Sequence, residues 1–225
     1  MTGIRSHFHH ELEDLERTIM VMATQVEEMV EKAVNALVSG DIDLANQVIQ
    51  ADEAIDQHHM DIHNRWMLLM ARQQPMATDL RLLSAILHLN TTLERTGDQC
   101  KNISKLAVLC ADLPTRDRIS EMVREMGDLV RPMIRTAADA FLRRDADEAR
   151  LLPAMDEPVD RLNRSMYHEV VECGPDPKLL EWATHMMMAA RALERVGDQA
   201  VDVAEQVAFL VTGDFQEFQS PKPGV

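Results

Sequence analysis

The chain has 225 residues and a formal net charge of −15, because 38 acidic residues outnumber 23 basic ones. No basic face gathers along the sequence, which argues against a nucleic-acid-binding protein. Glycine, proline and aromatic residues are few and methionines number 16, so long helices are expected in place of sheets.

The first predicted helix ends at the Ser39-Gly40-Asp41 break. Upstream of this break, apolar residues recur at alternating steps of three and four, which is the spacing of one buried helical face. The residues on this face are Leu12, Leu15, Ile19, Met22, Val26, Met29, Ala33 and Ala36. The sequence therefore predicts one long amphipathic helix at the start of the chain.

Two more helical patterns complete the first half of the chain. The second runs from the break to Arg72, where Pro75 and the two glutamines before it interrupt the pattern. The third begins with Thr78 and Asp79 as its expected cap, and a loop around Pro114 ends it. Short connections between three long helices predict an antiparallel bundle.

The second half of the sequence repeats the first. The segment Leu93–Gln99 (LERTGDQ) recurs as Leu193–Gln199 (LERVGDQ), a shift of 100 residues. Upstream, the acidic segment Asp52–Asp56 recurs as Asp156–Asp160, a shift of 104. The sequence therefore predicts an all-α protein of two tandem, pseudo-twofold-related antiparallel three-helix bundles.

The repeat also sets the expected domain organisation. We expect the first three-helix bundle over residues 1–113, the second over residues 114–213 and a flexible C-terminal tail over residues 214–225. Charges interrupt every apolar run before it reaches the roughly 20 residues of a membrane span, and no apolar secretory signal opens the chain. We therefore expect a cytoplasmic protein.

Acidic side chains lie one turn apart beside the apolar faces of two predicted helices. These are the third helix and its repeat in the second half of the chain, which is the sixth. Each copy carries a row at steps of four: Glu94, Asp98 and Asn102 in the first, and Glu194, Asp198 and Asp202 in the second. Like charges at this spacing repel, so two copies of the row suggest a compensating cation. For one copy alone, a solvated acidic face neutralised by Arg95 or Arg195 is the simpler interpretation.

The second predicted helix places Asp52 where its buried face should carry an apolar residue. An ionised carboxylate there must be paired, bind a metal or lie near an opening. The neighbouring acids and their repeats complete the set: Glu53, Asp56, Asp156, Glu157 and Asp160. If the second and third helices of each half pack so that their acidic turns lie side by side, four or more carboxylates converge in each half.

Converging oxygen ligands without thiolates favour a hard or borderline cation such as Mg²⁺, Mn²⁺ or iron, and the ligands suffice for more than one ion. Gly97 and Gly197 lie directly before the second acid of each row, at a cost of roughly 1 kcal/mol each relative to alanine inside a helix. Either close helix packing or room for a metal-bound ligand explains them.

Several signatures of catalysis are missing from the sequence. It contains no G-x-x-x-x-G-K-[ST] loop, no G-x-S-x-G elbow and no Glu-x-x-His pair. Their absence argues against an NTPase, an α/β-hydrolase and a ferritin-like di-iron oxidase, respectively. Neither carboxylate set adds a repeated His or Lys that would act as an acid or base, so we do not expect an enzyme.

Two segments closely resemble the signature of PhoU proteins, which are accessory regulators of bacterial phosphate uptake. They are Arg72–Leu83 (RQQPMATDLRLL) and Leu93–Ile103 (LERTGDQCKNI). The resemblance covers nearly the whole chain and implies two three-helix bundles side by side. It also implies a metal cluster in each, usually of iron or zinc, on paired Glu/Asp-x-x-x-Asp motifs. The matching residues are Asp52, Asp56, Glu94 and Asp98, then Asp156, Asp160, Glu194 and Asp198.

The resemblance further implies an adaptor role. Such a protein couples the ATPase subunit of a phosphate ABC transporter to a phosphate-responsive sensor histidine kinase and represses the phosphate-starvation response when phosphate is plentiful. We expect a homodimer that reaches the membrane only through these partners and that binds iron, zinc, manganese or magnesium. The alternatives are a non-haem metal enzyme such as a phosphohydrolase and an accessory protein of a non-ABC phosphate transporter.

The two copies differ in ways that bear on metal binding. Asp202 replaces Asn102, and Pro158 lies between Asp156 and Asp160. Because proline removes a backbone donor, we expect a kink in the fifth predicted helix and unequal metal occupancy of the two sites.

Overall fold

Helices make up all the regular structure of residues 2–73 and 75–218, which are the residues that this computed structural model describes. In chain order they are α1 (Thr2–Ser39), α2 (Ile42–Gln73), α3 (Thr78–Cys110), α4 (Asp117–Arg143), α5 (Ala146–Ala149), α6 (Leu152–Val171) and α7 (Pro177–Thr212). The all-α prediction and the two repeated bundles are confirmed.

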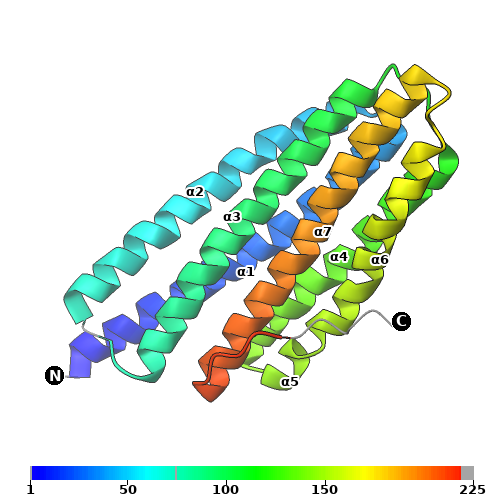
Figure 1. Cartoon of the computed structure of the whole chain (residues 1–225). Coiled ribbons are helices and arrows are strands. Elements are labelled where there is room, and N and C mark those ends of the chain that lie inside the picture. The colour runs from blue at the N-terminus through cyan, green and yellow to red at the C-terminus, as the bar shows by residue number, and fades with distance from the viewer. Residues whose placement is uncertain (1, 74, 219–225) are drawn as a thin grey trace.

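The two halves lie side by side (Figure 1). Helices α1, α2 and α3 pack on one another in the first half, and α4, α6 and α7 do so in the second. The halves meet along two pairs of helices, α1 with α4 and α3 with α7. The connection between the halves, residues 111–116, contains the predicted domain boundary at residue 113.

The second half differs from the predicted three-helix unit by one extra turn, α5. Arg144 adopts a left-handed conformation (φ 56°) that ends α4. The carboxylate of Asp145 then accepts hydrogen bonds from the amides of Asp147 and Glu148, at 3.0 and 2.9 Å, and starts a new turn. In the first half, Gly40 (φ 69°) makes the corresponding connection in a tight turn.

Helix boundaries otherwise follow the sequence signals, with three differences. Helix α3 begins at Thr78, but its N-cap position is Ala77, which makes no side-chain cap bond. Helix α6 runs through Pro158 as one element. Part of the predicted tail is packed: the Phe218 amide donates to Glu205 at 2.6 Å, and the Phe215 ring meets Phe209 edge to face. Gln74 of the predicted break and residues 219–225 of the tail lie outside the described residues.

One apolar core continues through both halves. Gly127 on α4 makes the close approach of α1 and α4 possible, because a Cβ there would lie only 2.9 Å from a methyl of Val34. Ion pairs flank this contact: Glu27 with Arg135 and, at 2.7 Å, Glu31 with Arg131. The halves are therefore joined by packing and by charge.

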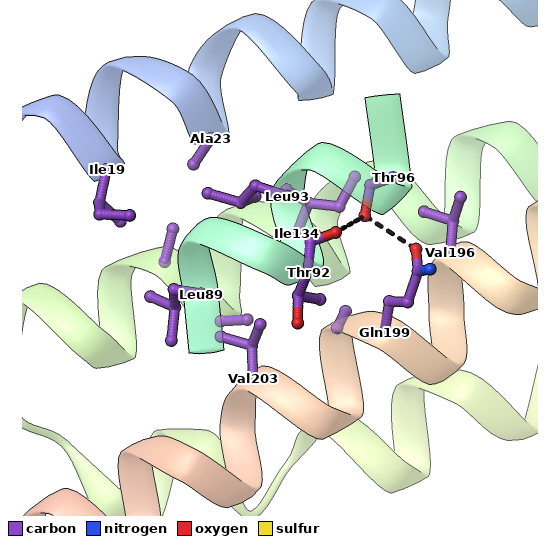
Figure 2. A pocket seen from close by; sticks show the side chains of 13 residues that line it. Ile19, Ala23, Leu89, Thr92, Leu93, Thr96, Ile134, Val196, Gln199 and Val203 are labelled. Carbon is purple, nitrogen blue, oxygen red and sulfur yellow. Dashed lines mark hydrogen bonds between the residues drawn. The ribbon is translucent and has the colours of Figure 1, made fainter. Parts of the chain in front are cut away.

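The centre of the molecule contains a small cavity of about 20 Å³ between α1, α3, α4 and α7 (Figure 2). Its walls are mostly apolar, and the Thr96 hydroxyl lies 2.9 Å from both the Thr92 carbonyl and the Gln199 side-chain oxygen. A cavity of this size holds about one water molecule. This cavity is too small for a substrate, so any larger ligand would bind between helices at the surface.

Candidate metal centres

The first carboxylate cluster lies between α2 and α3. Asp52 is almost completely buried, at 2% exposure of the whole residue, and its side chain faces α3. Lys101 on α3 donates a hydrogen bond to it, and the same ammonium lies 3.9 Å from Asp98. The Asp52 hydrogen bond raises the pKa of Lys101. The inward carboxylate of this half is thus paired with a cation from the protein itself.

Glu94 and Asp56 complete the first cluster. Burial raises the pKa of Glu94, and the charges of Asp98 and Asp56 raise it further. His59 on α2 acts in the opposite direction and lowers it. Asp52, Asp56 and Asp98 therefore lie near Lys101, and Glu94 lies near Asp56 and Asp98.

The second cluster has the corresponding carboxylates, and no lysine accompanies them within the part of the chain that the structure describes. One carboxylate oxygen from each of Asp156, Asp160 and Asp198 lies within 4.8 Å of the other two. The position that corresponds to Lys101 under the shift of 100 residues is Val201. Glu194, which is buried, flanks the three aspartates.

Negative charge in the second cluster is only partly balanced, because Arg191 pairs with Glu194 and Arg164 lies 3.4 Å from Asp160 while Asp156 has no cationic partner among the described residues. The Oδ1 atom of buried Asp156 and the Oε2 atom of Glu194 have no hydrogen-bond partner within the described part of the chain. Burial, together with the charges of Asp160, Asp198 and Glu194, raises the pKa of Asp156 to about 7. A buried group left without a partner is energetically costly, so this cluster needs a proton or a cation.

The donor set of the second cluster fits a metal ion. It offers several convergent carboxylate oxygens, which suit Mg²⁺, Mn²⁺ or iron, and one of them, the buried Oδ1 of Asp156, has no hydrogen-bond partner among the described residues. In the first cluster, the ammonium of Lys101 already pairs with the carboxylate of Asp52, which a metal ion would otherwise neutralise. The two halves are therefore not equivalent toward a cation.

The glycines before the second acids make room for the inward aspartates. A Cβ at Gly197 would overlap the carboxylate of Asp156, and a Cβ at Gly97 would lie 3.4 Å from Asp52 and 3.3 Å from Ile55. Close helix packing therefore explains both glycines, because it brings the inward carboxylate against each of them, and the role of that carboxylate as a metal ligand stays a prediction. The requirement for glycine is stricter in the second half, at Gly197, than at Gly97.

Two of the predicted candidate residues lie away from the clusters. Glu53 is exposed on α2. Glu157 forms ion pairs with Arg161 at 2.8 Å and Arg164 at 3.5 Å on its own helix. Each is one residue away from an inward aspartate, and neighbouring residues on a helix point in different directions.

Asn102 and Asp202, the third members of the two rows, face the opposite half of the protein. Asn102 lines a groove with Arg191 of α7. Burial raises the pKa of Asp202, while His88 and Arg95 of α3 lower it. A row at steps of four rotates by about 40° per step around a helix, so its third member leaves the face that carries the first.

Sequence reasoning did not find the role of Lys101. The signal was an unrepeated lysine one turn beyond Asp98, where the second copy has Val201. It also did not find the groove that Asn102 lines, because this groove combines residues far apart in the chain. Both features depend on how the helices pack.

The fold and the clusters define a class: a helical-repeat protein with paired carboxylates between the second and third long helices of each unit. The PhoU domain of the family matches residues 19–107 and again residues 123–207. The chain belongs to the PhoU family. In the part of it that the structure describes, no helix is long and apolar enough to cross a membrane.

Relatives support this assignment over nearly the full chain. A "phosphate-specific transport system accessory protein PhoU homolog" from Pseudomonas aeruginosa is 36% identical over 211 residues, which cover 93% of this chain and 87% of the relative. A homolog of the same description from Aquifex aeolicus is 32% identical and covers 94% of this chain and 96% of the relative.

Solved structures share the fold. The crystal structure of PhoU from Pseudomonas aeruginosa matches with a TM-score of 0.88 at 36% identity, over 92% of this chain and all of that one. The phosphate transport system regulatory protein PhoU from Streptococcus pneumoniae matches with a TM-score of 0.84 at 27% identity, over 93% of this chain and 99% of the other.

Proposed function

We propose that this chain is a cytoplasmic accessory regulator of phosphate transport that binds metal and acts as an adaptor. Its partners would be the ATPase subunit of a phosphate ABC transporter and a phosphate-responsive sensor histidine kinase. The observation that carries the proposal is the match with named phosphate-transport accessory proteins over more than nine-tenths of the chain. In this role the protein represses phosphate-starvation genes when phosphate is plentiful.

The charge of the molecule supports docking to such partners. With a net charge of −15, the protein is attracted to basic patches on the cytoplasmic parts of a transporter or kinase. Charge complementarity mainly speeds association, so binding should weaken as salt is added. We infer a homodimer as the functional form, which sedimentation of the purified protein would test.

The metal belongs, in this proposal, to the second cluster. Asp156, Asp160 and Asp198 would hold it, with Glu194 beside them. When bound, the ion supplies the positive charge that this group of carboxylates lacks. The residues themselves tie α6 to α7, as the ion pair of Asp52 with Lys101 ties α2 to α3.

Elemental analysis of protein purified without chelator tests the metal assignment. We expect bound metal in the wild type, loss of it in Asp198→Asn, and retention in the matched variant Asp98→Asn, which changes the corresponding residue of the first half. A wild type without metal, or equal loss in both variants, would contradict an assignment to the second cluster.

Deletion of the gene in its host tests the adaptor role. Phosphate-starvation genes should then be expressed despite ample phosphate, and the wild-type chain should restore repression. Tagged protein should recover the kinase and the transporter ATPase. Normal repression after deletion, with neither partner recovered, would contradict the adaptor role. It would favour the alternatives, which are a metal-dependent phosphohydrolase and an accessory protein of a non-ABC transporter.

A further inference from the structure

A basic groove lies between α3 and α7, which run side by side in Figure 1. Its volume is about 390 Å³. Lys105 on α3 and Arg191 and Arg195 on α7 bring positive charge to its walls. Gln99 and Asn102 add amide side chains, and the rest of the lining is apolar. We refer to these residues as the basic groove.

Positive charge in the basic groove is compensated only in part, because Arg195 lies near enough to Glu194 and Asp198 to lower the pKa of both. No carboxylate is among the described residues that line it. Arg191 donates a hydrogen bond to Glu194 outside the groove, whereas Lys105 and Arg195 form no ion pair with any described residue. Three cations that face one open space repel one another, so a bound anion would lower the free energy of the site.

The internal repeat shows that helix packing does not require this charge. Under the shift of 100 residues, Lys105 corresponds to Glu205 and Arg191 corresponds to Thr91. Near these positions, at the opposite end of the α3–α7 contact, Asp202 interacts with Arg95. The same pair of helices thus carries only basic charged side chains in the groove at one end and a mixture of acidic and basic ones, including Arg95, at the other.

The residue types in the basic groove suit phosphate groups attached to a larger molecule. The guanidinium of arginine binds phosphate oxygens through two parallel N–H donors. A volume of about 390 Å³ falls within the range of roughly 300–1,000 Å³ that is typical of small-molecule pockets. The exposed side chain of Met188 offers an apolar wall, and the two amides offer further hydrogen bonds.

We propose that the basic groove binds a small organic phosphate with two or more phosphate groups, of the size of a nucleoside diphosphate. Arg191, Arg195 and Lys105 hold the phosphates, and the organic part lies against Met188. The basic groove adjoins the second cluster through the hydrogen bond of Arg191 with Glu194, and its binding of an organic phosphate does not depend on the adaptor role.

Calorimetric titration of the full-length protein tests this site. ADP, pyrophosphate, inorganic phosphate and adenosine are titrated separately at low and physiological salt, without divalent cations. We expect saturable ADP binding at one site per chain, weaker binding of pyrophosphate and inorganic phosphate, and no binding of adenosine. Equal affinities for ADP and pyrophosphate would overturn the contact of the organic part, and absence of saturable ADP binding would overturn the site.

Variants chosen from the repeat supply the controls. Lys105→Glu introduces the residue that the chain itself carries at position 205, and Lys105 forms no ion pair with the carboxylates of either cluster in the described part of the chain. We expect it to weaken ADP binding by about tenfold or more, which corresponds to about 1.4 kcal/mol. Arg95→Ala removes one positive charge at the opposite end and should leave ADP binding unchanged, and thermal melts verify that both variants fold. Equal weakening by both variants would show a general charge effect and overturn the proposal.

Discussion

A single residue distinguishes the two carboxylate clusters. Lys101 places an ammonium on the buried carboxylate of Asp52, whereas Val201 leaves Asp156 without a partner. A buried carboxylate without a counter-charge is energetically costly, and a protein removes this cost with a proton, a cationic side chain or a metal. The two halves of this chain use different solutions to the same problem.

Replacing Lys101 with valine should make the first cluster resemble the second. Without its ammonium, Asp52 loses its partner, so the metal-free variant should lose on the order of 1–3 kcal/mol of unfolding free energy. Elemental analysis should then find additional bound metal compared with the wild type, and that metal should restore stability. An unchanged metal content, or unchanged stability of the metal-free variant, would refute the exchange of lysine for metal.

The raised pKa of Asp156 predicts how the stability of the metal-free protein depends on pH. Its pKa is about 7 in the folded protein and 3.8 in an unstructured chain, so between these values the folded state binds more protons. Its contribution to stability is therefore present at low pH and is lost as pH rises toward 7.

Urea unfolding of chelated protein at about pH 5 and about pH 8 measures this dependence. Stability should be higher at the lower pH, and Asp156→Asn should reduce the difference. Metal should bind more tightly at the higher pH, because it replaces the proton on the carboxylate. A variant with the same pH dependence as the wild type would show that Asp156 is not the group responsible.

At the scale of helices, the glycines before the second acids control how closely the helices of each pair approach. Gly197→Ala places a methyl group on the Asp156 carboxylate, so we expect a net loss of about 1–3 kcal/mol despite the better helix propensity of alanine. Gly97→Ala meets its neighbours at 3.3–3.4 Å and should perturb stability less. Thermal melts compare the two, and a larger loss in Gly97→Ala would contradict this order.

Much of the helical arrangement could be predicted from the sequence, because its signals are local. The Gly40 break, the apolar spacing and the internal repeat define the long helices, and the apolar face of α2 already marks Asp52 as an inward carboxylate. The extra turn α5 was not predicted, since it depends on the left-handed Arg144 and the Asp145 cap.

The site was less predictable than the helices because it depends on rotation around each helix axis and on tertiary contacts. The spacing correctly grouped Glu94 with Asp98, but it also included Asn102, which points toward the other half. No local pattern reveals that Lys101 reaches across to Asp52. Such a contact becomes visible only when the offset between the two helices is known.

On the scale of the whole molecule, a shared core joins the two halves. Because buried side chains form one continuous cluster, we expect a single cooperative unfolding transition by calorimetry and circular dichroism. Gly127→Ala should lower the stability of both halves together, by about 1–3 kcal/mol, since the added methyl group overlaps Val34 across the contact between α1 and α4. Arg124→Ala, at an exposed position of α4, is the control, and two separate transitions in the wild type would refute this coupling.

Arg191 connects the basic groove with the second cluster. It lines the groove and also donates a hydrogen bond to Glu194 beside the three aspartates. A metal that neutralises Glu194 would release this guanidinium to an anion in the groove. Thermodynamic reciprocity then requires the anion to tighten metal binding by the same factor. Two chemically different ligands would therefore favour each other through one shared side chain, and the protein would respond most strongly when both are present.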